Sequence, residues 1–74
     1  MEDFTIVVNR IEELQSTQDR QELERIMDKA RRTIIGGQDV LLVRESSNGK
    51  REKFDTLSNE SDFEEYRTRV FRFL

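Results

Sequence analysis

The chain has 74 residues, of which 39% are charged and 34% are hydrophobic, and its formal net charge is −3. A chain of this length forms one small domain, and because it has no cysteine it has no disulfide framework, thiolate site or zinc finger. Its mild acidity excludes the global basic field that marks many nucleic-acid-binding proteins.

The beginning of the chain contains no basic segment followed by an apolar one, and no apolar run approaches the roughly 20 residues of a membrane span. We therefore expect no signal peptide, no membrane contact and a cytoplasmic location.

Apolar residues near the N-terminus recur at helical spacing: Phe4, Val7, Val8, Ile11 and Leu14. This spacing predicts a helix over residues 4–14. The β-branched run from Thr5 to Val8 favours a strand instead. We give the helical period more weight, because it covers the longer stretch of sequence.

A second helix is predicted to begin after Asp19, which forms a capping box with Glu22. Its apolar stripe consists of Leu23, Ile26, Met27, Ala30 and Ile34. Gly36 or Gly37 supplies the left-handed residue that ends such a helix.

The sequence Asn48-Gly49 lies between two strand-like runs and is the strongest short-range signal for a β-hairpin with a type I′ turn. The predicted arms are Val40–Glu45 and Lys50–Asp55. Alternate residues of a strand share a face, so either Val40 with Leu42 or Leu41 with Val43 faces the core. The sequence leaves both arrangements open.

Ser61 and Glu64 form a second capping box and predict a helix from about Asp62. The apolar face of this last helix consists of Phe63, Tyr66, Val70 and Leu74. The predicted fold is a single α+β domain over residues 1–74 of order α-α-β-β-α, with one antiparallel hairpin packed on helices. Residues 1–18 form an extra N-terminal helix before an αββα unit at residues 19–74.

Little in this sequence points to catalysis. Histidine, the usual general base near neutral pH, is missing, and no serine, threonine or lysine has an identifiable activating partner. The acidic residues do not have calcium-loop spacing. We predict no enzymatic activity, no cofactor, no metal site and no small-molecule substrate.

Three groups of residues are candidates for a protein interaction surface. Leu41 and Val43 form one possible outer face of the hairpin, and a cluster of cations lies near the hairpin tip. Phe71 and Phe73 widen the apolar arc at the C-terminal end. The predicted interaction residues are Leu41, Val43, Lys50, Arg51, Lys53, Phe71 and Phe73. The same cations could also contact a phosphate backbone weakly, but acidic residues lie among them.

The run from Leu23 to Val70 resembles the W family of phage head-to-tail joining proteins, which are small αββα domains. The resemblance rests on apolar, glycine and turn residues along about two-thirds of the chain. They are Leu23, Ile26, Ala30, Gly36 or Gly37, Val40, Val43, Asn48-Gly49-Lys50-Arg51, Phe54, Thr56, Ser61-Asp62-Phe63 and Tyr66.

The resemblance implies a virion-associated assembly protein that forms a homo-oligomeric ring at the portal and presents a docking surface to the tail. Two other functions fit the sequence: a small regulatory adaptor that binds a partner protein through its apolar C-terminal end, and a weak nucleic-acid binder that uses the basic hairpin.

Overall fold

The computed structural model describes residues 3–72 and residue 74. The described residues form the elements β1 (Phe4–Val7), α1 (Val8–Ser16), α2 (Arg20–Ile35), β2 (Val40–Glu45), β3 (Arg51–Leu57) and α3 (Glu60–Phe71). The α+β class is therefore confirmed. The predicted order α-α-β-β-α is wrong at its beginning, because a strand precedes the first helix and adds to the hairpin.

The predicted helix over residues 4–14 is in fact a strand followed by a helix. Strand β1 pairs in parallel with β2, in a register that runs from Phe4 opposite Val40 to Val7 opposite Val43. The β-branched residues at this position prefer the extended backbone, and a partner strand is available to satisfy their backbone groups. The helical period is real from Val8 onward, where Ile11 and Leu14 are buried.

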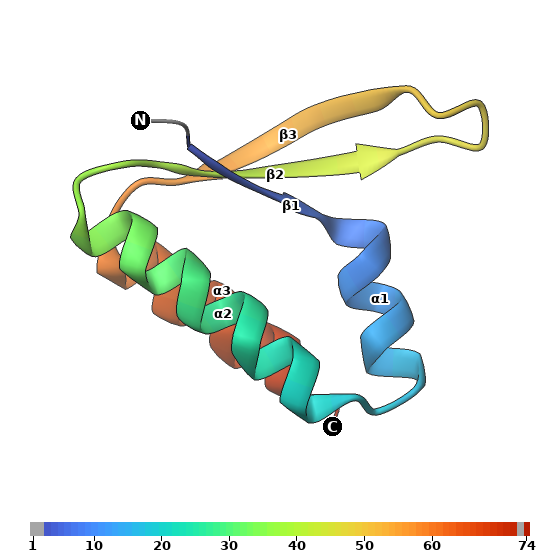
Figure 1. Ribbon diagram of the computed structural model, residues 1–74, viewed down its shortest axis with the longest axis horizontal. Helices are drawn as coiled ribbons and strands as arrows, with labels where there is room; N and C mark the ends of the chain where they lie inside the picture. The colour runs from blue at the N-terminus through green and yellow to red at the C-terminus, as the bar shows by residue number, and fades with distance from the viewer. Residues whose placement is uncertain (1–2, 73) are drawn as a thin grey trace.

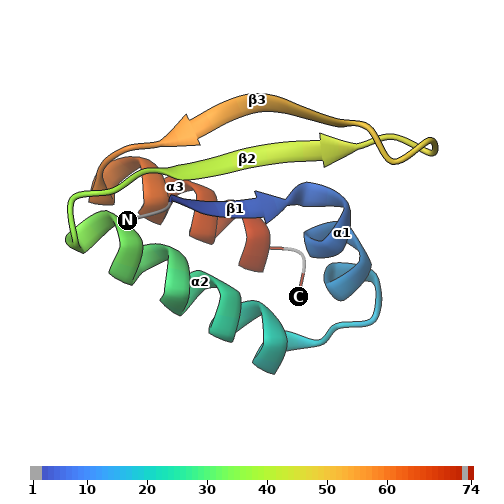
Figure 2. The ribbon, with the colours of Figure 1, turned by 45° about the horizontal axis from the view of Figure 1, so that its top comes forward.

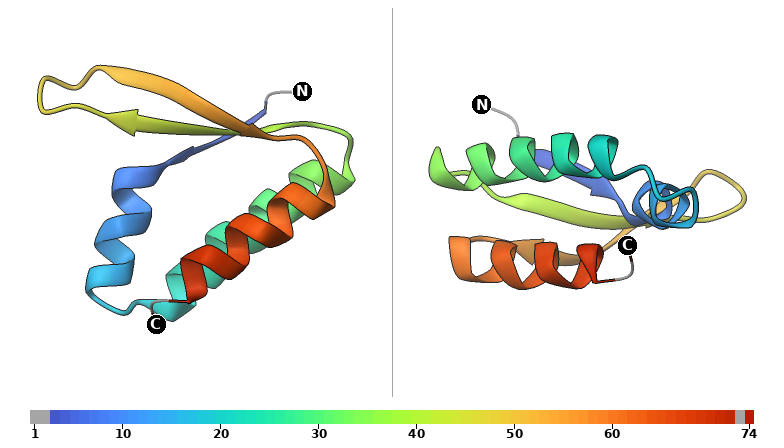
Figure 3. Two further views of the ribbon diagram at one scale, coloured as in Figure 1. Left: turned by 180° about the vertical axis from the view of Figure 1, so that it is seen from behind. Right: turned by 90° about the horizontal axis from the view of Figure 1, so that it is seen from below.

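The described strands form a mixed sheet in the order β1-β2-β3, with β2 in the middle and antiparallel to β3. Figure 2 shows the sheet as one layer and the helices as a second layer beneath it. Seen from below in Figure 3, α2 and α3 run in opposite directions, with α2 on the side of β1. The loop between β2 and β3 projects beyond α1 (Figure 1).

The core lies between the two layers. Val40 and Leu42 of β2 are 0% and 2% exposed, so this pair faces the helices and settles the alternative that the sequence left open. The other members of the core cluster are Ile6, Ile11, Leu14, Leu23, Met27, Ala30, Ile34, Leu57, Phe63 and Val70.

Helix α2 has the ends that its sequence predicts. Asp19 is the N-cap, and its Oδ1 accepts a hydrogen bond from the Glu22 N–H at 3.2 Å. At the other end Gly37 has φ +86°, so Gly37 rather than Gly36 supplies the left-handed residue.

The hairpin turn differs from the predicted type I′ turn, because Asn48 does not have a positive φ. Ser47 and Asn48 instead occupy a turn closed by the Gly49 N–H, which donates to the Ser46 carbonyl at 2.9 Å. Gly49 follows with φ +82°. This is the three-residue hairpin loop in which a left-handed glycine completes the connection.

The last helix begins earlier than predicted. Asn59 rather than Ser61 is the N-cap of α3, and its side chain accepts a hydrogen bond from the Asp62 N–H at 2.8 Å. Asparagine is among the strongest N-cap residues, and Glu60 and Asp62 then fall in the first turn, where acids favour the helix dipole.

Candidate interaction surface

The sheet has a face that lies opposite the helix layer, and we call it the open face. Paired residues in a sheet point to the same side, so the register defines its members. They are Thr5, Val7, Leu41, Val43, Lys53 and Thr56. Within the described residues no helix covers this face (Figure 2).

Apolar side chains from neighbouring strands come together on the open face. Val7 lies opposite Val43, and Leu41 lies between Thr5 and Thr56. Val7 and Leu41 are partly exposed, whereas Val43 is only 7% exposed. Leu41 and Val43, both predicted interaction residues, therefore share one surface.

A β-bulge in β3 sorts the charges between the two faces. Leu42 pairs with Asp55 and Val43 pairs with Lys53, so Phe54 between them has no partner on β2. The bulge places Lys53 on the open face and Asp55 on the helix side of the sheet. Without it, Lys53 and Asp55 would share a face, as residues two apart in a regular strand do.

The remaining charges of the hairpin form pairs of opposite sign on each side of the sheet. Arg51 lies opposite Glu45, and its Nε is 3.1 Å from the Glu45 carboxylate. Glu52 lies opposite Arg44 on the helix side, where both Arg44 terminal nitrogens donate to Glu12 of α1 at 3.0 and 3.2 Å. Arg51 and Lys53 therefore lie on the side of the sheet that carries the open face.

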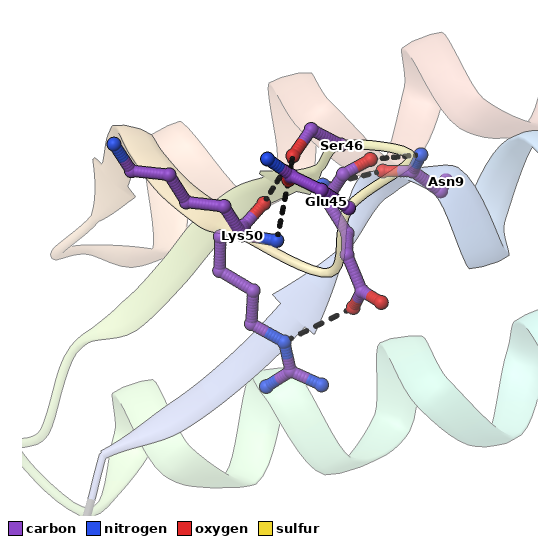
Figure 4. A network of polar contacts seen from close by, with 6 residues as sticks. Asn9, Glu45, Ser46 and Lys50 are labelled. Atoms are coloured by element: carbon purple, nitrogen blue, oxygen red, sulfur yellow. Dashed lines mark hydrogen bonds and ion pairs between the residues drawn. The ribbon is translucent and has the colours of Figure 1, made fainter.

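The base of the hairpin is fixed by a polar network, which Figure 4 shows from close by. Asn9 Nδ2 donates to the Glu45 carbonyl at 2.8 Å, and the Glu45 N–H donates to Asn9 Oδ1 at 2.9 Å. The Ser46 N–H donates to the Lys50 carbonyl at 2.8 Å, and Asn48 Oδ1 accepts from the Lys50 N–H at 3.2 Å. Lys50 itself is exposed, so its charge lies in solvent at the tip.

The predicted C-terminal residues lie apart from the open face. Phe71 packs against the core, and its ring is flanked by the guanidinium groups of Arg20 and Arg67, 5.4 and 4.8 Å from the ring centre. These are cation–π contacts. Phe73, also predicted, lies outside the described residues.

Three surface residues were missed by the sequence analysis. Thr5 and Val7 were placed in a helix, although their β-branched side chains were a signal for a strand. Phe54, the single apolar residue of the predicted second arm, is 57% exposed. No local sequence signal shows that a bulge isolates it.

Three ionisable side chains on the helix side have shifted pKa values, and the hydrogen bonds to Glu12 raise the pKa of the Arg44 guanidinium. The hydrogen bonds from Arg44 lower the pKa of the Glu12 carboxyl below its ordinary value of 4.5, and burial partly opposes this effect. Burial raises the pKa of the Tyr66 hydroxyl to about 12, although Arg69 lowers it somewhat. Among the described residues no group of three or more His, Cys, Asp or Glu could hold a metal ion.

Comparison of the chain with protein-family models, with curated proteins and with solved structures finds no match. None of the described helices is both long enough and apolar enough to span a membrane.

Proposed function

We propose that the chain is a non-enzymatic protein interaction module that binds a protein partner through the open face. The observation that supports this proposal is the alignment of Val7, Leu41 and Val43 on the face away from the helices. Of these, Val7 and Leu41 are partly exposed, and burying their side chains against another protein is favourable by about 25 cal/mol per Å² of apolar surface.

The charges around the open face indicate which charges the partner's surface carries. Lys53 and Arg51 lie on this side of the sheet, where Arg51 is paired with Glu45, whereas Glu52 and Asp55 lie on the other side. Because complementary potentials select partners and speed their association, the partner surface carries aliphatic side chains together with carboxylates. The assembly role that the W-family resemblance implies, with a partner in a phage head or tail, is one form of this proposal.

A photo-crosslinking amino acid at Leu41, placed in the protein in the cells that naturally make it, tests the proposal. We expect a discrete adduct with one protein, and no such adduct from the same probe at Arg31, an exposed residue of the helix layer. Equal adducts from both positions, or none from Leu41, would contradict the proposal.

A matched pair of charge reversals tests the specificity of that adduct. Lys53→Glu reverses a charge on the open face, and Glu52→Lys reverses the neighbouring charge on the opposite face. The affinity of the purified partner, measured by calorimetry, should fall about tenfold for Lys53→Glu, in line with loss of a charge complementarity. It should change little for Glu52→Lys.

A further inference from the structure

The two edges of the sheet differ sharply in how they are protected. Natural edge strands avoid unwanted pairing by carrying charges and bulges, and β3 has both, with Arg51, Glu52, Lys53 and Asp55 around its bulge. Strand β1 has the sequence Phe-Thr-Ile-Val, with no charge. Within the described residues no strand pairs with its outer edge.

The register shows which backbone groups β1 presents at that edge. In a parallel pair, alternate residues direct both their N–H and C=O groups to the neighbour. Glu45 directs both groups to Asn9, and the Asp39 N–H donates to Asp3 Oδ1 at 3.3 Å. The odd-numbered residues of β2 therefore face β1. It follows that the backbone N–H and C=O groups of Phe4 and Ile6 point toward β2, whereas those of Thr5 point outward.

We propose that two copies of the chain pair edge to edge through β1, antiparallel, about a two-fold axis at Thr5. Such an axis is perpendicular to the sheet, so every side chain stays on its own side of the sheet. The residue at the axis then lies opposite the same residue of the other copy. Thr5 is suited to that position because its outward N–H and C=O can bond reciprocally to those of its copy. An axis at Ile6 is less suited, because it pairs Thr5 with Val7 of the other copy and needs the Val7 carbonyl as an acceptor. Val7 is the N-cap of α1, and the carbonyl of an N-cap residue already accepts the first hydrogen bond of its helix.

The surface beside β1 also fits a second copy. A groove along this edge is lined largely by apolar side chains: Phe4, Ile6, Val7, Ile11 and Ile26, with Arg10 at its end. An axis at Thr5 brings Phe4 opposite Ile6 of the other copy and brings the two α2 helices together near Ile26. Partly exposed apolar groups of both copies thereby become buried.

The charges that flank this groove are complementary under the two-fold axis. Lys29 lies at the Phe4 end, with its Nζ 4.8 Å from the centre of the Phe4 ring. Glu22 lies about two helical turns away, on the other side of Ile26. Rotation about the axis therefore brings Lys29 of each copy toward Glu22 of the other. Glu22 lies 3.5 Å from Arg25 of its own copy, so Lys29 would join an existing ion pair.

The inference deepens the proposed function, because it names a second copy as one partner and extends the open face across the axis. Thr5 and Val7 of both copies would lie side by side in one sheet. It rests on the proposed function only in treating the chain as an interaction module, since the two contacts use different atoms.

Sedimentation equilibrium of the full chain from micromolar to millimolar concentration tests the dimer. A short edge and one helix face make a small interface, so we expect Kd on the order of 10–100 µM. Thr5→Pro removes the outward N–H and leaves the β1–β2 hydrogen bonds intact, as prolines do on edge strands. It should weaken the dimer roughly tenfold or more. Thr5→Val keeps the N–H and should bind like the wild type.

Amide exchange of the wild type gives a second measurement that needs no variant. The Thr5 amide should exchange quickly at low concentration and become protected as the concentration rises, while the Ile6 amide is protected throughout. A wild type that stays monomeric to millimolar concentration, or a Thr5 amide whose exchange rate is independent of concentration, overturns the dimer.

Leu41→Lys separates the two proposals. Self-association that is lost in Leu41→Lys but kept in Thr5→Pro overturns the β1 dimer and supports an open-face contact between copies. Self-association that is lost in Thr5→Pro but kept in Leu41→Lys supports the β1 dimer, and the crosslinking experiment then decides the open face independently.

Discussion

At the scale of single residues, the side chains of Asp3 and Asn9 form hydrogen bonds to Asp39 and Glu45 where backbone groups of a longer strand would do so. Strand β1 pairs with β2 at a constant separation of 36 residues, and the bonds from Asp3 to Asp39 and from Asn9 to Glu45 keep that separation. Asn9 supplies both a donor and an acceptor, although its own backbone already belongs to α1. The ladder therefore extends past the residue at which the strand turns into a helix.

Asn9→Ala should lower the free energy of unfolding by about 1 kcal/mol, since two partly solvated hydrogen bonds are lost and the higher helix propensity of alanine offsets part of the loss. Urea unfolding measures the change. Asn9→Asp keeps an acceptor for the Glu45 N–H but loses the donor, so its stability should lie between the two. An alanine variant as stable as the wild type would contradict this role.

The pKa of Tyr66 makes stability depend on alkaline pH. This residue is the single tyrosine of the chain, so its ionisation can be followed directly by ultraviolet absorbance. Burial raises its pKa from 10.0 to about 12. Because the folded state holds the proton more tightly, the associated stability is complete below pH 10 and is lost as the pH rises toward 12.

We expect the absorbance of the folded protein to titrate near pH 12 and that of the urea-unfolded protein near pH 10. Tyr66→Phe should remove the extra loss of unfolding free energy over this pH range. Titration of the folded protein near pH 10 would show that the hydroxyl is solvated.

At the scale of elements, the sequence predicts well what its neighbours in the chain determine. Helix α2 was predicted with its ends and its apolar stripe because each signal is local: Asp19 and Glu22 lie three residues apart at its N-terminus, and Gly37 directly follows its C-cap. Strand β1 was missed because its identity depends on β2, which is far away in the sequence. The bulge at Phe54 was missed for a similar reason, since it is defined only by the pairing of β2 with β3.

Deletion of Phe54 tests the assignment of the bulge. The deletion joins Lys53 directly to Asp55, and both can then keep their present partners in a regular ladder. We expect a folded protein whose unfolding free energy is within about 1 kcal/mol of the wild type, as measured in urea. Phe54→Ala is the control that keeps the extra residue.

The same deletion should make the β3 edge more prone to association, because a bulge is one of the features that protect an edge. Light scattering during concentration of the deletion variant and of Phe54→Ala compares the two. An unfolded deletion variant would show that the bulge is required to connect the strands.

At the scale of the whole molecule, the protein consists of one sheet layer and one helix layer around a single thin core. A domain of this size buries only about 60% of the surface that its unfolded chain exposes. The open face belongs to this architecture, because one layer of helices leaves the opposite side of the sheet in solvent. The sequence showed that the hairpin has an apolar face that the helices do not cover, but only packing against the helices decided which face that is.

Two neighbouring leucines of β2 report on this layering. Leu42→Ala creates a cavity in the core and should cost about 2–5 kcal/mol, whereas Leu41→Ala on the open face should cost less than about 1 kcal/mol. Chemical unfolding of both variants measures the difference. Equal losses would mean that both faces of β2 are packed.

The constant separation of 36 residues between β1 and β2 also has a consequence for biosynthesis. Ribosomes add about 5–20 residues per second, so β2 follows β1 after roughly 2–7 s. During that interval the nascent chain carries an apolar strand before its hydrogen-bonding partner has been made. The charged residues translated between the two strands then separate this segment from the next apolar strand, and the N-terminal strand joins the sheet only after the hairpin arm has left the ribosome.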